Sequence, residues 1–163
     1  MDLYKNKFRI ASTRLKEWDY STPSWYYVTI CTKFMKHWFG EIKNDEMVLN
    51  DAGKIVETLW NTIPDHYKNV ELDEFVIMPN HIHGIIILGS VETGHAPSLL
   101  GNVVGSFKSA VSKYLRGKMN LEFNWQPRFY DHIIRNENDL LRIRTYIKNN
   151  PLKWELDKYY SKE

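Results

Sequence analysis

The stretch that decides the fold is FVIMPNHIHGIIIL, residues 75–88. It predicts the end of one apolar β-strand, a Pro-Asn turn and a second apolar strand. Successive side chains of a strand point to opposite faces, so His81 and His83 are expected on the same face. The residues expected on the other face, in the core, are Ile82, Ile86 and Leu88. Two imidazoles side by side on a strand are suited to bind one metal ion.

A His-x-His pair alone is weak evidence for a metal site, because two rings can also be satisfied structurally. Their setting in an isoleucine-rich strand strengthens the case, since buried polar groups need partners. The chain has one cysteine, Cys31, which excludes a structural zinc site with several thiolates. A further ligand to the ion must therefore come from another part of the chain.

Length and composition indicate one domain of ordinary globular character, with 163 residues and a net charge of +2. Between residues 101 and 155 there are ten basic and five acidic side chains, so this part is the basic one. A solvated surface explains such an excess as readily as a polyanionic partner does. A single cysteine suits a reducing cytoplasm, and no stretch reaches the roughly 20 apolar residues of a membrane span. We therefore expect a cytoplasmic protein without a membrane partner.

The remaining patterns divide the chain into a basic N-terminal arm (1–20), one domain (21–150) and a short tail (151–163). Strands are expected at 24–32, 37–41, 46–49, 70–78 and 81–88 and within 123–134, and helices at 51–63, 99–117 and 137–149. Asn50 and Asn136 are expected to cap the first and third helices, which Pro64 and Pro151 end. This order predicts the α+β class, most simply a ferredoxin-like antiparallel sheet with packed helices.

The third predicted helix carries a second set of polar candidates. Its core stripe is formed by Leu140, Ile143 and Ile147. Tyr146 and Asn150 are four residues apart and so share a face beside this stripe, where the helix meets the sheet. By spacing alone, the tyrosine is a packing residue and the asparagine a C-terminal cap.

Three blocks of sequence then carry a resemblance to a known family. They are MPNHIHG (78–84), WQPRFYDHIIR (125–135) and YIKNNP (146–151). In this order and spacing the chain resembles the HUH single-tyrosine transposase superfamily, named for its His-hydrophobic-His motif. Within it the chain is most similar to the REP-associated tyrosine transposases. The resemblance extends from about residue 24 to residue 154.

The resemblance implies an enzyme that cleaves and rejoins single-stranded DNA near hairpins. His81 and His83 would bind a divalent metal, Mg²⁺ or Mn²⁺, and Tyr146 would be the nucleophile. Mobile relatives have a glutamine four residues after the tyrosine as a further ligand, and here Asn150 stands in that position. The family's product is a 5′-phosphotyrosine with a free 3′-OH. Both a monomer and a homodimer occur among relatives.

Basic and aromatic residues of the C-terminal third are candidates for DNA contact and nucleoid association. They are Lys108, Lys113, Arg116, Trp125, Arg128 and Arg135. Trp125 and Phe129 fit the core equally well, and no role follows for His132.

Two other functions fit parts of the pattern. One is a catalytically silent nucleic-acid-binding protein on the same fold. The other is a metal-dependent phosphodiesterase that activates water, which is disfavoured because the only carboxylates expected near the histidine strand are Asp73 and Glu74. Tyr130 is the alternative nucleophile if Tyr146 is not used.

Overall fold

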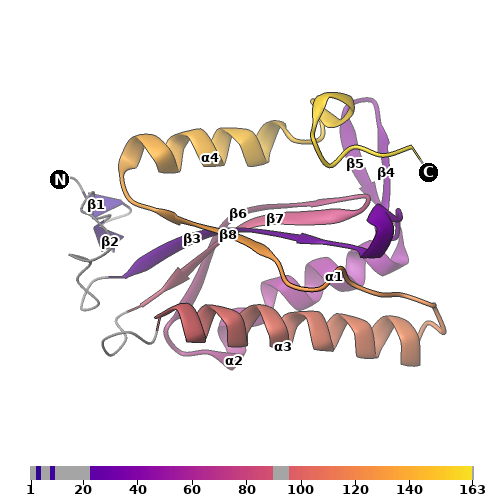
Figure 1. Cartoon of the computed structure of the whole chain (residues 1–163), viewed down its shortest axis with the longest axis horizontal. Helices are drawn as coiled ribbons and strands as arrows, with labels where there is room; N and C mark the ends of the chain where they lie inside the picture. Colours follow the sequence, from indigo (N-terminus) through magenta and orange to yellow (C-terminus); the bar gives the residue numbers. More distant parts are fainter. Residues whose placement is uncertain (1–2, 5–7, 10–22, 90–95, 163) are drawn as a thin grey trace.

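The computed structural model describes residues 3–4, 8–9, 23–89 and 96–162, and its centre is a four-stranded sheet (Figure 1). The strands are β3 (Ser24–Cys31), β6 (Val70–Met78), β7 (His81–Leu88) and β8 (Tyr130–Ile134). Their order across the sheet is β6-β7-β3-β8, and every neighbouring pair is antiparallel. The histidine strand β7 is thus an inner strand, hydrogen-bonded on both sides.

Helices cover both faces of this sheet (Figure 1). On one face lie α1 (Asp51–Asn61), the short α2 (Ile63–His66) and α3 (Ala96–Gly117), and on the other lies α4 (Glu137–Asn149). The succession β3-α1-β6-β7-α3-β8 with this strand order is the ferredoxin-like arrangement, with α4 added behind it. The predicted α+β class is therefore confirmed.

Two smaller pairs of strands flank the sheet. The hairpin of β4 (Gly40–Lys43) and β5 (Glu46–Leu49) is inserted between β3 and α1. Near the N-terminus β1 (Leu3–Tyr4) pairs with β2 (Phe8–Arg9). The rest of the predicted arm over 1–20 lies outside the described residues, so that prediction stays open.

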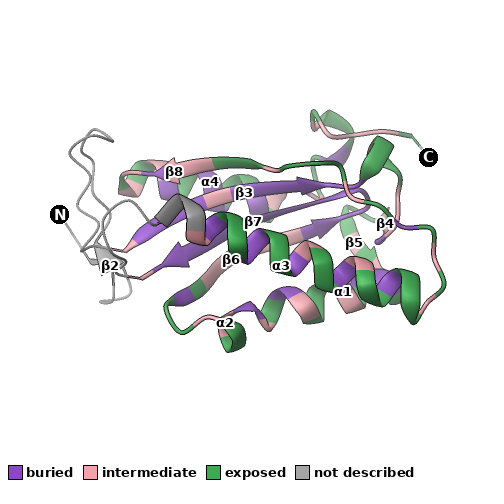
Figure 2. Cartoon of the chain, turned by 60° about the horizontal axis from the view of Figure 1, so that its bottom comes forward, coloured by how far each residue is buried: buried purple, intermediate pink, exposed green. Residues whose placement is uncertain are grey.

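Strand β7 is buried along its whole length (Figure 2), and its period-two pattern divides its side chains between two cores. Ile82, Ile86 and Leu88 pack with α1 and α3, as the sequence predicts. Ile85 and Ile87 face the other way and pack against α4. His81 and His83 belong to this second face, so the face that buries α4 also carries the histidines.

Capping residues and prolines in the sequence predicted most helix ends correctly. The Asn50 side chain accepts a hydrogen bond from Gly53 N, and Asn136 accepts one from Asp139 N. The predicted end at Pro64 was wrong in detail. The chain turns at Thr62 and resumes as α2, where proline is tolerated because the first turn of a helix needs no N–H donor there.

Two strand boundaries also differ from the prediction. β4 covers 40–43 and not 37–41, because Lys33–Met35 forms a 3-10 turn and residues 36–38 lead into the hairpin. Only 130–134 of the aromatic segment 123–134 is a strand. Its earlier part touches β3 through a single bridge between Thr32 and Trp125.

Candidate functional site

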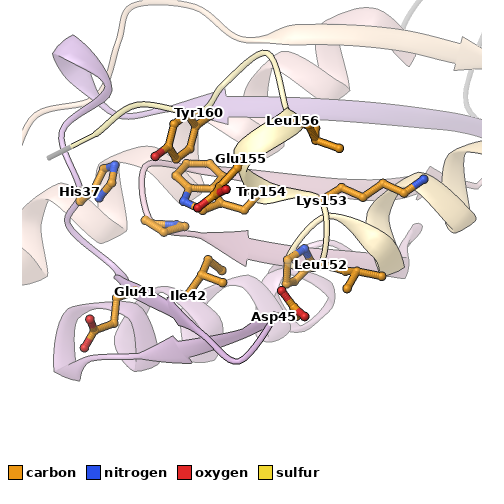
Figure 3. A pocket seen from close by; sticks show the side chains of 12 residues that line it. His37, Glu41, Ile42, Asp45, Leu152, Lys153, Trp154, Glu155, Leu156 and Tyr160 are labelled. Carbon is orange, nitrogen blue, oxygen red and sulfur yellow. The ribbon is translucent and has the colours of Figure 1, made fainter.

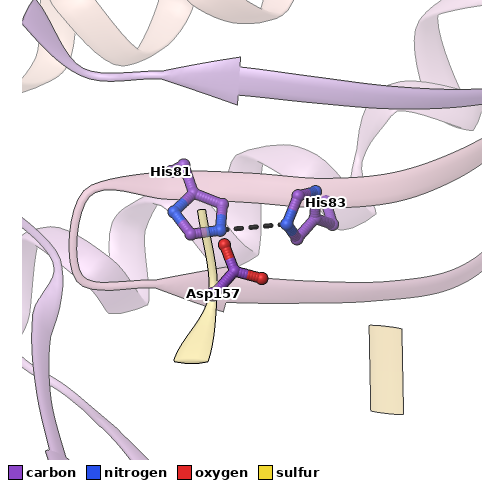
Figure 4. A group of neighbouring side chains, drawn as sticks. All are labelled: His81, His83 and Asp157. Atoms are coloured by element: carbon purple, nitrogen blue, oxygen red, sulfur yellow. Dashed lines mark hydrogen bonds between the residues drawn. The ribbon is translucent and has the colours of Figure 1, made fainter. Parts of the chain in front are cut away.

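His81 and His83 lie side by side on β7 and are fully buried. Their Nε2 atoms are 3.0 Å apart and share a hydrogen bond (Figure 4). The rings are held by an inner strand whose backbone is paired on both sides, which leaves the pair little freedom. The prediction that both histidines share one face is confirmed by this geometry.

The other nitrogen of each ring has a hydrogen-bond partner that orients it. His81 Nδ1 is 2.6 Å from Asn80 Oδ1, an acceptor, so Nδ1 carries the proton and Nε2 keeps its lone pair. His83 Nδ1 lies 2.8 Å from the Tyr27 hydroxyl and 2.9 Å from Thr29 Oγ1. Such outer contacts are how metal-binding imidazoles are oriented.

Burial keeps both imidazoles neutral at physiological pH. It lowers the pKa of His81 to about 4, more than the nearby Asp157 charge and the Asn150 amide raise it. It also lowers the pKa of His83 well below the ordinary value, and the neighbouring His81 adds to the effect. A neutral imidazole keeps a lone pair on one ring nitrogen, through which it can bind a metal ion without first losing a proton.

Tyr146 reaches this pair from α4. Its ring centre is 5.2 Å from that of His83, and about a third of the residue is exposed. Its hydroxyl donates a 2.5 Å hydrogen bond to Asp157 Oδ2. Burial, and then the carboxylate of Asp157, raise the pKa of Tyr146 well above its usual range. The hydroxyl is therefore held in its protonated form in this arrangement.

Asn150 follows the last turn of α4 and is buried beside the histidines. Its Nδ2 donates to Asp157 Oδ2 over 3.1 Å. Its Oδ1 is buried and has no hydrogen-bond partner among the described residues. An amide oxygen left unpaired in the interior is costly, so a ligand at this point would satisfy it.

Asp157 is the residue that sequence reasoning missed. One carboxylate oxygen and one ring nitrogen from each of His81 and His83 all lie within 4.8 Å of one another (Figure 4). The expectation that Asp73 and Glu74 are the only nearby carboxylates was wrong. Asp73 instead binds Arg144, and the site's carboxylate comes from a tail 74 residues beyond His83 (157 − 83). No spacing rule in the sequence connects the two segments.

The tail that carries Asp157 is packed over the histidines. The Trp154 ring stacks on His81 with ring centres 6.0 Å apart, and the Tyr159 ring is 4.9 Å from His81. Asn80 Nδ2 donates to Tyr159 O, which joins the β6–β7 turn to the tail. The tail thus forms one wall of the site.

These residues fit a divalent ion. Two ligands about 2.1 Å from an ion at right angles, as Mg²⁺ prefers, are about 3.0 Å apart. The two Nε2 atoms have this separation, a carboxylate oxygen of Asp157 clusters with both rings, and the buried Asn150 amide adjoins His81. The donor set contains two nitrogens and two oxygens, which also suits Mn²⁺.

A cleft of about 480 Å³ opens next to Tyr146. Its walls carry further tyrosines, the imidazole of His132, two bases, Arg142 and Lys158, and the carboxylate of Asp157. His132, which had no predicted role, is hydrogen-bonded to Asp139 over 2.7 Å. The cleft thus combines flat aromatic surfaces with positive charge beside the candidate nucleophile.

A larger cleft, of about 650 Å³, lies between the β4–β5 hairpin and the tail (Figure 3). Its walls carry three carboxylates, those of Glu41, Asp45 and Glu155, and one lysine, Lys153. This acidic lining does not suit a phosphate backbone.

The predicted DNA contacts are not gathered around Tyr146. Lys113 and Arg116 lie on α3, on the other face of the sheet from α4, as does Lys108. Lys108 Nζ donates to the backbone oxygens of Gln126 and Arg128 and so holds that loop.

The other predicted contacts differ in their positions. Trp125 is half-buried and packs on the α3 core, so the core alternative describes it well. Arg135 is half-buried just after β8. Arg128 is exposed and lines a small cleft that also includes Tyr130 and Tyr159, next to the histidines. Of the six predicted contacts, Arg128 is the one whose cleft adjoins the tail over the site.

Comparison with known proteins places this geometry in a family. The sequence profile described as "Transposase IS200 like" matches residues 25–150, about three quarters of the chain. The chain belongs to the IS200-like transposase family. Members of this family are enzymes of DNA cleavage and rejoining.

Two relatives extend this result. An uncharacterized protein from Haemophilus influenzae is 38% identical over 165 residues, which cover 91% of this chain and 92% of that protein. The structure of a REP-associated tyrosine transposase bound to a REP hairpin superimposes with a TM-score of 0.55 at 19% identity. It covers 94% of this chain and 74% of the other, and shows that this IS200-like chain shares its fold.

In the described part, no helix has the length and apolar character needed to cross a bilayer.

Proposed function

We propose that this IS200-like transposase cleaves and rejoins single-stranded DNA beside hairpins through a covalent bond between Tyr146 and a 5′-phosphate. The single observation that carries the proposal is the position of the Tyr146 ring, 5.2 Å from His83, at the edge of a buried pair of neutral imidazoles. His81, His83 and Asn150 would hold Mg²⁺ or Mn²⁺. When bound, the ion offsets negative charge on the scissile phosphate and orients it.

The reaction is an exchange of one phosphodiester for another. Tyr146 Oη forms a bond to phosphorus, and the bond from phosphorus to the 3′ oxygen breaks with its electron pair on that oxygen. The phenol loses one proton and the departing 3′ oxygen gains one, so protons balance. The energy of the ester bond is kept in the phosphotyrosine, and the free 3′-OH, or that of another strand, can reverse the attack.

The chain's own residues prepare the attack by position. The hydroxyl proton of Tyr146 points to Asp157 Oδ2, so its oxygen lone pairs face away from that carboxylate. Thr29 and Tyr27 fix the His83 ring, and Asn80 fixes that of His81. A nucleophile placed by fixed neighbours avoids the entropy cost of finding its geometry during the reaction.

Single-stranded DNA suits the cleft beside Tyr146. Unpaired bases can stack on Tyr130, while Arg142 and Lys158 can contact the backbone. The relative with the same fold was solved with a REP hairpin, which supports hairpin DNA as the first substrate to test here. Whether one chain or two forms the active unit does not change this choice.

The decisive experiment uses a pool of DNA hairpins with randomised single-stranded flanks, labelled with different dyes at the two ends, and Mn²⁺. A 5′-phosphotyrosine retains the DNA on the 3′ side of the cut. We therefore expect the 3′-end dye to migrate with the protein in a denaturing gel and the 5′-end dye on a shortened strand whose 3′-OH a polymerase can extend.

Matched tyrosine variants identify the nucleophile. Tyr146→Phe should abolish the adduct, while Tyr130→Phe and Tyr159→Phe should retain it, since these rings also lie near the site. An adduct that survives in Tyr146→Phe would contradict the proposal. Cleavage without any adduct would favour the water-activating phosphodiesterase, and tight hairpin binding without cleavage would favour a silent binding protein.

A further inference from the structure

We propose that Asp157 is a metal ligand supplied by the C-terminal tail, which makes this tail part of the active site. The inference rests on the proposed function, since it concerns the same ion. Its basis is the convergence of a carboxylate oxygen with one ring nitrogen of each of His81 and His83, all within 4.8 Å of one another.

Charge explains why the site needs this residue. Two imidazoles and the Asn150 amide supply no negative charge, so they would leave the charge of a divalent ion uncompensated in a largely buried position. One carboxylate halves that excess and supplies the oxygen ligand that hard ions such as Mg²⁺ prefer. Among the described residues, Asp157 is the carboxylate that clusters with both histidines.

The carboxylate is held in position from several sides. The backbone N–H of Tyr159 donates to Oδ1 over 2.8 Å, and Asn150 Nδ2 donates to Oδ2 over 3.1 Å. Tyr146 donates to the same Oδ2. Asn150 Nδ2 thus helps to position Asp157, while the Oδ1 of the same amide stays available for an ion. A fixed carboxylate loses less entropy on binding an ion than a free one.

This arrangement also joins the nucleophile to the ion. Because Tyr146 and the metal share Asp157, a change at this residue alters both the ion's affinity and the direction of the tyrosine hydroxyl. A tail that merely covered the site would instead leave metal binding unchanged when its carboxylate is removed. The two possibilities give opposite results in a binding measurement.

The test is titration of the metal-free full-length protein with Mn²⁺ in a calorimeter, without DNA. We expect one site in the parent chain and at least tenfold weaker binding in Asp157→Asn, which keeps the side chain's shape. Glu155→Gln, an exposed carboxylate two residues away, should bind as the parent does. Equal affinity of Asp157→Asn and parent would overturn the inference, as would the absence of Mn²⁺ binding by the parent.

A second variant tests contact with the ion directly. Cys31 lies opposite His81 on the same face, so the variant is made in a Cys31→Ser background, where Asp157→Cys with Cd²⁺ should give a thiolate-to-metal charge-transfer band that Cys31→Ser alone lacks. No such band, in a variant whose circular dichroism matches the parent, would count against ligation. Faster DNA cleavage by Asp157→Asn with unchanged Mn²⁺ affinity would show that the tail only covers the site, and it would refute the inference. Loss of the adduct in Tyr146→Phe tests the proposed function separately.

Discussion

At the scale of single residues, Gly84 shows why the strand with the histidines tolerates no extra atom on its other face. A Cβ built at Gly84 would be 2.3 Å from Trp60 Cζ2, and Trp60 is fully buried. We expect Gly84→Ala to lower the free energy of unfolding by about 1–3 kcal/mol, because the core cannot accept the methyl group without moving. Urea unfolding measures this. The control Gly105→Ala, in open space on α3, should instead stabilise by about 1 kcal/mol.

The burial of His81 predicts a pH dependence of stability in EDTA-containing buffer. Its pKa falls from 6.5 to about 4 on folding, so between these values the unfolded chain binds a proton that the folded chain does not. Stability is therefore lost as the pH falls below about 6.5. Between pH 7 and pH 5 this histidine should lower the free energy of unfolding by about 2 kcal/mol, since one pKa unit corresponds to about 1.4 kcal/mol. Urea unfolding of His81→Asn should show a shallower slope, whereas equal slopes would contradict the prediction.

At the scale of elements, α4 is tied to β6 by two ion pairs of different character. Arg144 Nε donates to Asp73 Oδ2 over 2.6 Å, with both side chains nearly buried, whereas Lys148 and Glu74 are 3.5 Å apart and more exposed. Asp73→Ala should cost about 3–5 kcal/mol in unfolding free energy because it leaves Arg144 without this carboxylate. Glu74→Ala should cost less than about 1 kcal/mol. Similar losses of unfolding free energy in the two variants would contradict this prediction.

At the scale of the whole molecule, the tail belongs to the folded body and not to a separate appendage. Trp154 is 7% exposed and stacks on His81, which lies 73 residues earlier (154 − 81). Trp154→Ala should lower the free energy of unfolding by about 3–5 kcal/mol, the usual cost of removing a buried tryptophan. Leu156→Ala, 86% exposed in the same turn, should change it by less than about 0.5 kcal/mol. A loosely attached tail would make the two variants alike in urea unfolding.

The sequence by itself determined the features that depend on local periodicity. The alternation of β7 placed His81 and His83 on one face, and helical spacing predicted the buried stripe of α4. The caps at Asn50 and Asn136 follow from hydrogen bonds within one turn. These predictions succeed because the atoms concerned are close in the chain, so steric rules connect them before any tertiary contact forms.

Only the tertiary structure decided which distant groups meet. It brought Asp157 to the histidines, used Asp73 to bind Arg144, and turned Lys108 toward the backbone of the 126–128 loop. Charge and residue type are the same whether a side chain binds DNA, a metal or a neighbouring segment. Which of these partners a side chain binds depends on how segments dozens of residues apart pack together, and no periodicity in the chain encodes that packing.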